Sequence, residues 1–259
     1  MLLEDRIAVV SGIGPGMGRD ISLAFAREGA NLVLGARTEE RLAEVAAEVE
    51  SLGRKAVWAR TDIRDDGDCR RLAQTATEAF GRIDVLVNNA FVQPPLETIE
   101  TAESDTWRDA FDVNVIGSVQ MTKACLPAMK AQGSGSVVFI GSMSARRIRR
   151  KFGVYAATKT ALMATAQTLA KELGRDGIRV NTVLPGYIWG PSLQWFFSYL
   201  AEKQGRTPED IYAEVAGETC LNHIPTPAEI ADAVLFFASD LSRVVTGQSL
   251  DVNAGHWFA

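Results

Sequence analysis

Cysteine and histidine are scarce in this chain of 259 residues, which contains three cysteines and two histidines. Cys69, Cys125 and Cys220 are odd in number, lie far apart and form no Cys-x-x-Cys pair. Their number and spacing give little support to a disulfide framework or to a zinc cluster. We therefore expect no metal site and a reducing, cytoplasmic compartment.

The sequence also has no large excess of one charge. It contains 27 Lys and Arg residues against 32 Asp and Glu residues, a formal net charge of -5, and 47% hydrophobic residues. This composition excludes a disordered chain and argues against a general nucleic-acid or membrane-surface binder. Glu4 and Asp5 stand where a secretory signal would need a basic stretch followed by an apolar core, so we recognise no targeting segment.

One long uncharged run extends from Val180 to Ala201. It contains Asn181, Pro185 and Gly186, which are poorly suited to a membrane span. We interpret the run as a strand, a turn and an apolar loop, and we expect no membrane partner.

Short apolar runs alternate along the chain with stretches in which apolar residues recur every three or four positions. The runs that we predict as strands read RIAVVS, NLVLGA, KAVWAR, IDVLVNN, SVVFIGS, IRVNTVLP and QSLDVN. Helices are predicted between them, the later ones over about 65–80, 104–130, 155–173 and 228–239. This alternation is typical of an α/β protein whose parallel sheet is covered by helices on both faces, here as one domain over 1–259. Residues 190–226 are too long for a plain connection, which indicates a functional segment.

A glycine-rich turn, SGIGPGMG, follows the first predicted strand and leads into a predicted helix. Gly12, Gly16 and Gly18 would let the backbone turn tightly and approach a pyrophosphate, while the N-terminus of the helix offers free N–H groups. The alternative is a tight strand-to-helix turn without a ligand. The strand before the turn and the helix after it favour a dinucleotide site.

The end of the second predicted strand reads Gly35, Ala36, Arg37, Thr38. An NAD site usually has a carboxylate here for the ribose hydroxyls, whereas the Arg37 guanidinium could pair with a 2′-phosphate. The position therefore favours NADP over NAD, unless Arg37 is only a solvated residue at the start of a helix. Asp62, after the third strand, suits a bond to an adenine amino group or a helix cap.

Tyr155 and Lys159 stand at positions i and i+4 of YAATK, on one face of a predicted helix. An ammonium near a phenol stabilises the phenolate, so we expect the pKa of Tyr155 to be lowered and its hydroxyl to act as a general acid or base. Ser142, at the end of the strand SVVFIGS, could hold the same substrate oxygen. By itself the Tyr-x-x-x-Lys pair could equally be a surface pair.

Taken in chain order, SGIGPGMG, Asp62, the NNA at 88–90, Asn114, Ser142, YAATK and the LPG at 184–186 resemble the short-chain dehydrogenase/reductase family. The resemblance covers essentially the whole chain. It implies a Rossmann-like, doubly wound parallel sheet of about seven strands, a nicotinamide cofactor, and assembly as a homotetramer or homodimer.

The resemblance also implies roles for individual residues. Tyr155 would be the acid/base, Lys159 would lower its pKa and hold the nicotinamide ribose, and Ser142 would orient the substrate oxygen. Asn114 would anchor a water that links Lys159 to solvent. The expected cofactor site comprises Ser11, Gly12, Gly16, Met17, Gly18, Arg37, Asp62, Ile63, Asn88, Asn89, Ala90, Tyr155, Lys159, Pro185, Gly186 and Ile188.

Three positions depart from the family pattern. Ser11 replaces the usual Thr and keeps a hydroxyl. Pro15 stands where some NADP-preferring members have a basic residue, so the preference for NADP depends on Arg37 alone. Phe91 replaces the glycine of the usual NNAG, and its ring either narrows the pocket or points into the core.

Two features bear on the substrate. Arg146, Arg147, Arg149, Arg150 and Lys151 follow closely after Ser142. They could receive a carboxylate, a phosphate or a carrier such as coenzyme A, or they could form a solvated loop or salt bridges at a subunit interface.

The segment at about 187–225 begins with many aromatic residues. It would cover a partly apolar substrate, or else pack into the core or against another subunit. The expected substrate residues are Phe91, Arg149, Trp189 and Trp195. The tail NAGHWFA would pack against a neighbouring subunit.

These observations predict an NADP(H)-preferring oxidoreductase. It would transfer a hydride between nicotinamide and a carbonyl or secondary alcohol of a medium-to-bulky, partly apolar small molecule, with or without an anionic group. One alternative is an NAD-dependent alcohol dehydrogenase of the same fold. Another is a catalytically silent cofactor sensor or scaffold, which would have no need of the set Asn114, Ser142, Tyr155 and Lys159. We expect no nucleic-acid partner.

Overall fold

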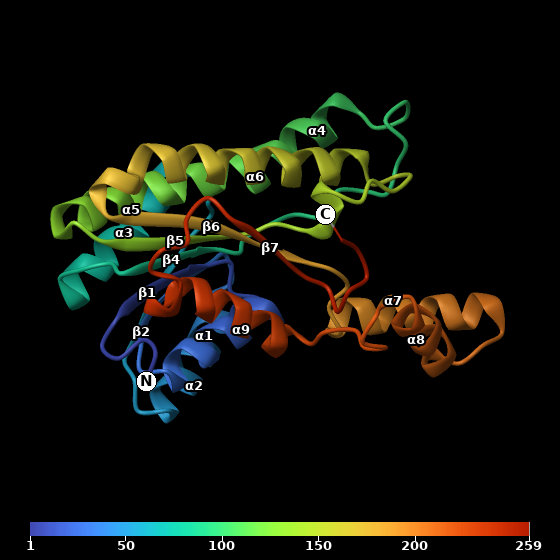
Figure 1. Ribbon diagram of the computed structural model, residues 1–259, viewed down its shortest axis with the longest axis horizontal. Helices are drawn as coiled ribbons and strands as arrows, with labels where there is room; N and C mark the ends of the chain where they lie inside the picture. Colours follow the sequence, from blue (N-terminus) through green and yellow to red (C-terminus); the bar gives the residue numbers. More distant parts are fainter. Residues whose placement is uncertain (259) are drawn as a thin grey trace.

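Seven parallel strands form the centre of the molecule, in the order β3-β2-β1-β4-β5-β6-β7 (Figure 1). The computed structural model describes residues 1–258. The strands are β1 (Ile7–Ser11), β2 (Asn31–Ala36), β3 (Ala56–Arg60), β4 (Val85–Asn88), β5 (Gly135–Ile140), β6 (Ile178–Pro185) and β7 (Ser249–Val252). The predicted Rossmann-like sheet is confirmed.

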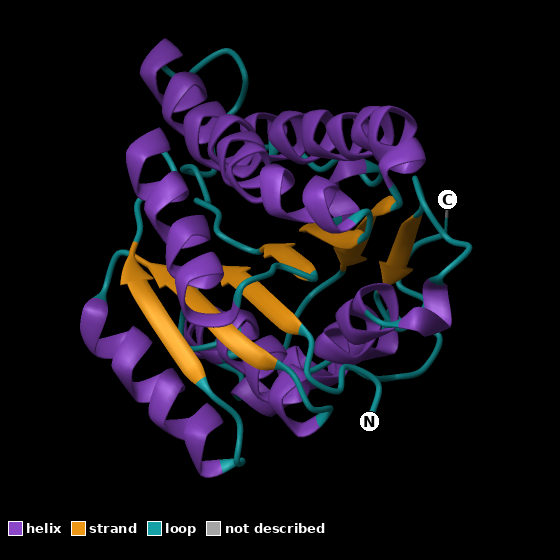
Figure 2. Cartoon of the chain, turned by 90° about the vertical axis from the view of Figure 1, so that its left-hand side faces the viewer, coloured by secondary structure: helices purple, strands orange, loops and turns teal. Residues whose placement is uncertain are grey.

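Helices connect the strands and lie on both faces of the sheet (Figure 2). They are α1 (Met17–Arg27), α2 (Glu39–Ser51), α3 (Asp66–Phe80), α4 (Ser104–Phe111), α5 (Ser118–Gln132), α6 (Gly153–Leu173), α7 (Pro191–Gln204), α8 (Pro208–Gly217) and α9 (Pro227–Ala238). A π-helical segment, η1 (Asp112–Gly117), joins α4 to α5, and three single turns of 3-10 helix lie at Met143–Ala145, Gly174–Asp176 and Asp240–Ser242.

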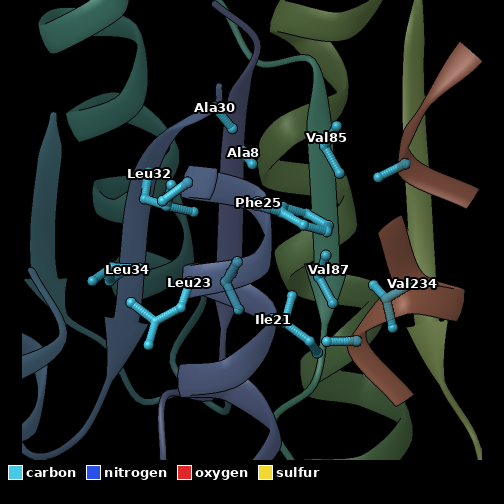
Figure 3. Close-up of a cluster of buried hydrophobic side chains, with 14 of the residues drawn as sticks. Ala8, Ile21, Leu23, Phe25, Ala30, Leu32, Leu34, Val85, Val87 and Val234 are labelled. Carbon is cyan, nitrogen blue, oxygen red and sulfur yellow. The ribbon is translucent and has the colours of Figure 1, made fainter. Parts of the chain in front are cut away.

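Alternate side chains of each strand contribute to two separate cores. Ala8 and Val10 of β1 pack with apolar residues of α1, α2 and α9 (Figure 3). Ile7 and Val9 point the other way, into a cluster with α3, α5 and α6. Because successive side chains of a strand point to opposite faces, apolar runs such as IAVVS can fill both cores at once.

Local signals set the ends of the helices. The carboxylate of Asp65 accepts a hydrogen bond from Asp68 N at 3.0 Å, which caps α3. Gly81 ends the same helix with a φ of 77°. The helix predicted over 65–80 is therefore confirmed, and Asp65 rather than Asp62 is its cap.

The apolar loop predicted before Ala201 is wrong, because this part of the chain forms α7. Pro191 stands at the start of the helix, where its missing N–H costs nothing. Phe197 is buried within a small cluster of its own that also contains Ile211 of α8 and Ile224. The apolar residues of this region pack on one another, so they form a helical pair beyond the ends of the strands (Figure 1).

The helix predicted over 104–130 is interrupted by the π-helical segment η1. Such segments are rare and often lie at functional sites. Asn114 lies inside it and is buried. No helix in the described part of the chain is both long enough and apolar enough to cross a membrane.

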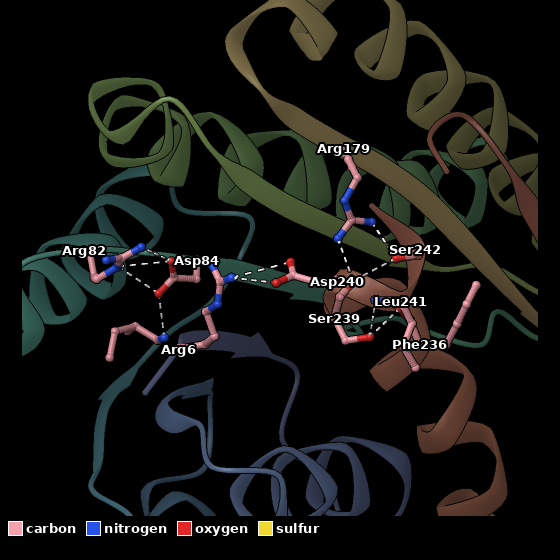
Figure 4. A network of polar contacts seen from close by, with 10 residues as sticks. Arg6, Arg82, Asp84, Arg179, Phe236, Ser239, Asp240, Leu241 and Ser242 are labelled. Atoms are coloured by element: carbon pink, nitrogen blue, oxygen red, sulfur yellow. Dashed lines mark hydrogen bonds and ion pairs between the residues drawn. The ribbon is translucent and has the colours of Figure 1, made fainter. Parts of the chain in front are cut away.

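A polar network closes the edge of the sheet at which the strands begin (Figure 4). Arg6 contacts the buried carboxylate of Asp84 at 3.5 Å and Asp240 at 3.1 Å. Arg179 donates a hydrogen bond to Phe237 O at 2.9 Å, near the C-terminus of α9. These charged groups thus have partners. A cavity of about 410 Å³ opens among them, and another cavity lies at the opposite ends of the strands.

Candidate active site

A cavity of about 630 Å³ opens at the carboxyl ends of the strands. It lies where β1 is flanked by β2 on one side and β4 on the other, the point at which the strand order reverses and doubly wound sheets bind their ligands. The predicted site residues that line it are Ser11, Gly12, Gly16, Met17, Gly18, Arg37, Asp62, Ile63, Asn89, Ala90, Phe91 and Ile188. We call it the cofactor cavity.

The glycine-rich turn forms one wall of this cavity. Gly12 has a φ of +98°, and a Cβ atom there would lie 2.3 Å from Ala90 N. A Cβ atom on Gly18 would lie 2.3 Å from Gly12 O, the oxygen that accepts a hydrogen bond from Asn89 Nδ2 at 2.6 Å. By contrast, a Cβ atom on Gly14 or Gly16 would meet nothing within 4 Å.

The turn thus packs tightly on its inner side and stays open toward the cavity. The N-terminus of α1, which begins at Met17, faces the same space. Free backbone N–H groups and a positive dipole end at this place fit a pyrophosphate. A nicotinamide dinucleotide therefore fits the cradle that these residues form.

Arg37 and Thr38 line the far end of the cavity together with Asp62 and Arg64. Arg64 pairs with Asp62 at 2.6 Å, and this hydrogen bond lowers the pKa of the Asp62 carboxyl. Arg37 is exposed, and it forms no ion pair within residues 1–258. Arg64 is occupied by Asp62, so the Arg37 guanidinium is the group at this end that can bind an anionic group of a ligand.

The structure brings Tyr155, Lys159 and Ser142 together. Tyr155 and Lys159 are one turn apart on α6, and the Ser142 side chain lies near Tyr155 and favours its phenolate form. Lys159 is buried and donates a hydrogen bond from Nζ to Ile140 O at 2.8 Å. Its Nζ lies 5.7 Å from the centroid of the Tyr155 ring.

The expectation of a lowered phenol pKa is wrong for this arrangement. Burial raises the pKa of Tyr155 to about 12, and the Ser142 side chain opposes this only in part. Burial also lowers the pKa of Lys159 to about 7. The physical cause is the same for both, since removing water disfavours the phenolate and the ammonium alike. The Lys159 ammonium bonds to a carbonyl rather than to the phenol, so it gives the phenolate little help.

The side chain of Asn114 forms hydrogen bonds with the backbone of Val92, in the segment after β4. Its Oδ1 accepts a hydrogen bond from Val92 N at 2.7 Å, and its Nδ2 donates to Val92 O at 3.0 Å and to Thr158 Oγ1 of α6 at 3.1 Å. The side-chain amide is therefore fully engaged inside the protein. The water-anchoring role expected for Asn114 stays a prediction.

Several predicted cofactor residues lie beside the cavity rather than on its surface: Asn88, Tyr155, Lys159, Pro185 and Gly186. Asn88 is buried and donates a hydrogen bond from Nδ2 to Thr122 Oγ1 at 3.0 Å. Other residues line the cavity that were not predicted from the sequence: Ile13, Gly14, Pro15, Gly35, Ala36, Thr38, Thr61, Arg64, Val92, Asp109, Val113, Gly190, Pro191, Ser192, Leu193 and Pro227.

Gly190 to Leu193 are the most informative of the missed residues, because they form the start of α7. Proline at a first helical position is a sequence signal for a helix start, and it could have located this one.

The basic cluster after Ser142 is largely paired within its own chain. Arg146 forms an ion pair with Asp251, and Arg147 contacts His256 Nε2. Arg149 contacts the hydroxyl of Tyr187, and its guanidinium lies 5.1 Å from the centroid of the Phe152 ring. Arg149 is thus the member of the cluster that is joined to the segment after β6.

The remaining predicted substrate residues have different surroundings. Phe91 lines the cavity with an exposed fraction of 55%, so its ring narrows the pocket and does not enter the core. Trp189 packs inside the α7–α8 pair, 4.6 Å from the Tyr212 ring. Trp195 is 70% exposed on α7. Neither tryptophan lines the cofactor cavity.

Part of the C-terminal tail packs against its own chain. His256 is buried, stacks on Tyr187 with ring centroids 5.5 Å apart, and lies with Nε2 3.0 Å from Glu218 Oε2. Phe258 is 71% exposed. The expected packing of the tail against another subunit therefore does not involve the His256 side chain.

Comparison with known proteins identifies the family. The family model described as Enoyl-(Acyl carrier protein) reductase matches residues 12–256. The short chain dehydrogenase/reductase astE of Aspergillus oryzae is 34% identical over 255 residues, which cover 98% of this chain and 95% of the relative. The chain belongs to the short-chain dehydrogenase/reductase family.

Solved structures of short-chain dehydrogenases agree in fold. Carveol dehydrogenase of Mycobacterium avium, solved with NAD, is 30% identical with a TM-score of 0.92, and the match covers 98% of each chain. A 7α-hydroxysteroid dehydrogenase, solved with NADH and 7-oxo glycochenodeoxycholic acid, is 30% identical with a TM-score of 0.88 and coverage of 98% and 94%. This chain is accordingly an NAD(P)-dependent oxidoreductase that acts on alcohol or keto groups.

Proposed function

We propose that this short-chain dehydrogenase/reductase prefers NADP(H) and that its substrate is a medium-to-bulky, partly apolar carbonyl compound or secondary alcohol with an anionic group. The observation that supports the cofactor preference is the Arg37 guanidinium at the end of the cofactor cavity: it forms no ion pair within residues 1–258, and no carboxylate ends β2. The position of the Arg149 guanidinium next to the aromatic side chains of Tyr187 and Phe152 supports a substrate with both an anionic group and an apolar part.

A bound nicotinamide would supply the hydride acceptor or donor. The glycine-rich turn and the N-terminus of α1 would hold its pyrophosphate, and Arg37 a 2′-phosphate. The protein itself handles the proton. Tyr155 exchanges a proton with the substrate oxygen, and Ser142, which lies near Tyr155, holds that oxygen in place. A phenol with a pKa of about 12 stays protonated at neutral pH, so Tyr155 has a proton to donate to a ketone.

The cofactor preference is tested by fluorescence titration with NADPH and with NADH at one ionic strength. A hydrogen bond to a charged group contributes about 1.5–3 kcal/mol, so Arg37→Ala should weaken NADPH binding by about 10- to 150-fold and leave NADH binding nearly unchanged. Arg41→Ala is the matched control, because Arg41 is also exposed but pairs with Glu44 on α2. Equal affinity of the wild type for the two cofactors would contradict the proposal.

An NAD-dependent alcohol dehydrogenase is the second candidate function. The two similar structures described above were solved with NAD or NADH. Tighter binding of NADH than of NADPH by the wild type would favour this candidate and direct the substrate search to alcohol oxidation.

The anionic group of the substrate is tested with pairs of neutral and acidic ketones of equal size. One similar structure holds 7-oxo glycochenodeoxycholic acid, which supports an oxo acid as a substrate class. We expect Arg149→Ala to raise KM for the acidic ketone by about tenfold or more and to leave the neutral ketone unaffected. Arg150→Ala, an exposed neighbour, is the control. Equal activity on both ketones, unchanged by Arg149→Ala, would contradict an anionic group on the substrate.

Assembly as a homotetramer or homodimer remains part of the proposal. Val244 and Ile148 are 88% and 70% exposed, and contact with another subunit would cover such apolar side chains. Light scattering of the purified protein measures the mass, and a monomer at micromolar concentration would contradict this expectation.

A further inference from the structure

Phe91 lies between the cofactor cavity and Lys159. It lines the cofactor cavity, whereas Lys159, the residue expected to hold the nicotinamide ribose, does not. Lys159 is buried, and the centroid of the Phe91 ring lies 5.4 Å from its Nζ. The ring therefore lies over the ammonium on the side of the cavity.

Few polar groups surround the Lys159 ammonium. It donates one hydrogen bond, to Ile140 O at 2.8 Å, and Tyr155 is the titratable group that faces it, with a ring centroid at 5.7 Å. Within residues 1–258 no carboxylate forms an ion pair with Lys159, and burial lowers its pKa to about 7. The faces of the Phe91 and Tyr155 rings are thus its other electrostatic partners, since a ring face attracts a cation.

The backbone next to Phe91 is held in place by the helix that carries Lys159. Val92 exchanges two hydrogen bonds with the Asn114 amide, at 2.7 and 3.0 Å. Asn114 also donates to Thr158 Oγ1, in the residue before Lys159. The Phe91 ring lies 6.5 Å from the Tyr155 ring, centroid to centroid. Phe91 is therefore fixed at its base, while its ring is 55% exposed.

We propose that Phe91 is a positioning residue: its ring covers the Lys159 ammonium and has to move aside before Lys159 can contact a bound cofactor. Glycine, the usual residue here in the family, has no ring and could not do this. The proposal rests on the proposed function only where it names the cofactor. The cover itself is a property of the protein alone.

Competitive acetylation of the full-length protein, without added cofactor, tests the cover. The labelling of each lysine is measured by peptide mass spectrometry, with the exposed Lys123 as the internal reference. A covered amine reacts only while it is uncovered, so Phe91→Ala should raise the relative rate at Lys159 by about 2- to 30-fold, the range that loss of a cation–π contact implies. Phe258→Ala, which removes an exposed ring elsewhere, should leave that rate unchanged. Equal rates at Lys159 in the wild type and Phe91→Ala would overturn the proposal.

Phe91→Leu distinguishes the effect of the aromatic ring face from the effect of side-chain volume. It also replaces Phe91→Ala as the test variant if the alanine variant does not fold. Leucine keeps most of the volume but offers no π face to the ammonium. Because the ring face favours the charged form, the pH midpoint of Lys159 labelling should fall by about half to one unit in Phe91→Leu. A midpoint equal to that of the wild type would contradict a cation–π contact.

Titration with NADPH and NADH then measures the consequence for binding. If the ring has to move, Phe91→Ala should bind its preferred cofactor more tightly, by about the same 2- to 30-fold. Unchanged or weaker binding would contradict the displacement step. Faster labelling in a protein that binds neither cofactor would refute the proposed function and leave the cover standing. Unchanged labelling of Lys159 in a protein that binds NADPH would refute the cover over Lys159 and leave the proposed function intact.

Discussion

The cofactor cavity and the α7–α8 pair are neighbours, yet they are constructed differently. Backbone contacts form the wall of the cavity, where a single added Cβ on Gly12 would lie 2.3 Å from Ala90 N. Side-chain packing forms the α7–α8 pair, in which Phe197 and Ile211 belong to a small apolar cluster. Contacts between backbone atoms tolerate few residue types, whereas an apolar cluster accepts any set of side chains of similar total volume. The first kind of wall therefore leaves a recognisable sequence motif and the second does not.

The largest expected effect concerns the proton donor beside the cavity. Removing the hydroxyl in Tyr155→Phe should lower kcat by about 10²- to 10⁴-fold, the usual contribution of a general acid or base. Cofactor affinity should stay close to that of the wild type, because Tyr155 does not line the cofactor cavity. Steady-state kinetics and NADPH titration measure the two quantities, with Tyr199→Phe on α7 as the control. Full turnover in Tyr155→Phe would show that another group transfers the proton.

Phe197→Ala is expected to separate the two regions. The loss of a fully buried phenylalanine costs about 3–5 kcal/mol, and here the loss falls on the small cluster of α7 and α8. Hydrogen exchange should therefore speed up in residues 191–217 and stay slow in β1. Phe25→Ala, in the core of Figure 3, is the matched control and should speed exchange throughout the sheet. Uniformly faster exchange in Phe197→Ala would mean that the two regions unfold as one unit.

Gly12→Ala and Gly14→Ala test the backbone wall as a pair. Gly12 combines a φ of +98° with the close approach to Ala90 N, so alanine there should destabilise the fold by about 1–3 kcal/mol and abolish cofactor binding. A Cβ on Gly14 would meet nothing within 4 Å, and its φ is not positive, so the stability should change little. Urea unfolding and NADPH titration measure both effects. The same loss of stability in the two variants would contradict the described geometry.

The last expected effect is a dependence of stability on pH. The pKa of Lys159 is lowered to about 7 in the folded protein, from an unfolded value near 10.5. Between these values the unfolded chain binds more protons, so this group makes the free energy of unfolding rise with pH, by at most about 1.4 kcal/mol per unit. Lys159→Met should lack this rise, and Lys123→Met should keep it. Urea unfolding at pH 7.5 and 9.5 measures this dependence, and the same change in the free energy of unfolding for the wild type and Lys159→Met would refute the lowered pKa of Lys159.

The sequence predicted those parts of the site that depend on local chain geometry. The glycine-rich turn needs residues without a Cβ at fixed positions, and Tyr155 and Lys159 meet because one helical turn separates them. Arg37 could be predicted because it directly follows a strand. The predicted roles of these residues in binding and catalysis await the experiments above.

Contacts between distant parts of the chain could not be predicted. Asn114 is 22 residues from Val92, and no periodicity indicates that its amide holds that backbone. The apolar residues after Pro191 were assigned to a loop because the α8 residues that bury them are recognised only in three dimensions. Arg147 and His256 are 109 residues apart, so their contact left no local pattern either.

The sequence by itself determined the strands of the parallel sheet, the glycine-rich turn and the spacing that places Tyr155 and Lys159 together, because periodicity, turn chemistry and helical spacing are local properties of a chain. Only the tertiary structure decided where the Phe91 ring lies, which member of the basic cluster contacts Tyr187, and in which direction the pKa values of Tyr155 and Lys159 move. These depend on burial and on neighbours far away along the chain. Two residues one turn apart can stabilise each other's charge in water, but once both are buried the loss of water outweighs that attraction.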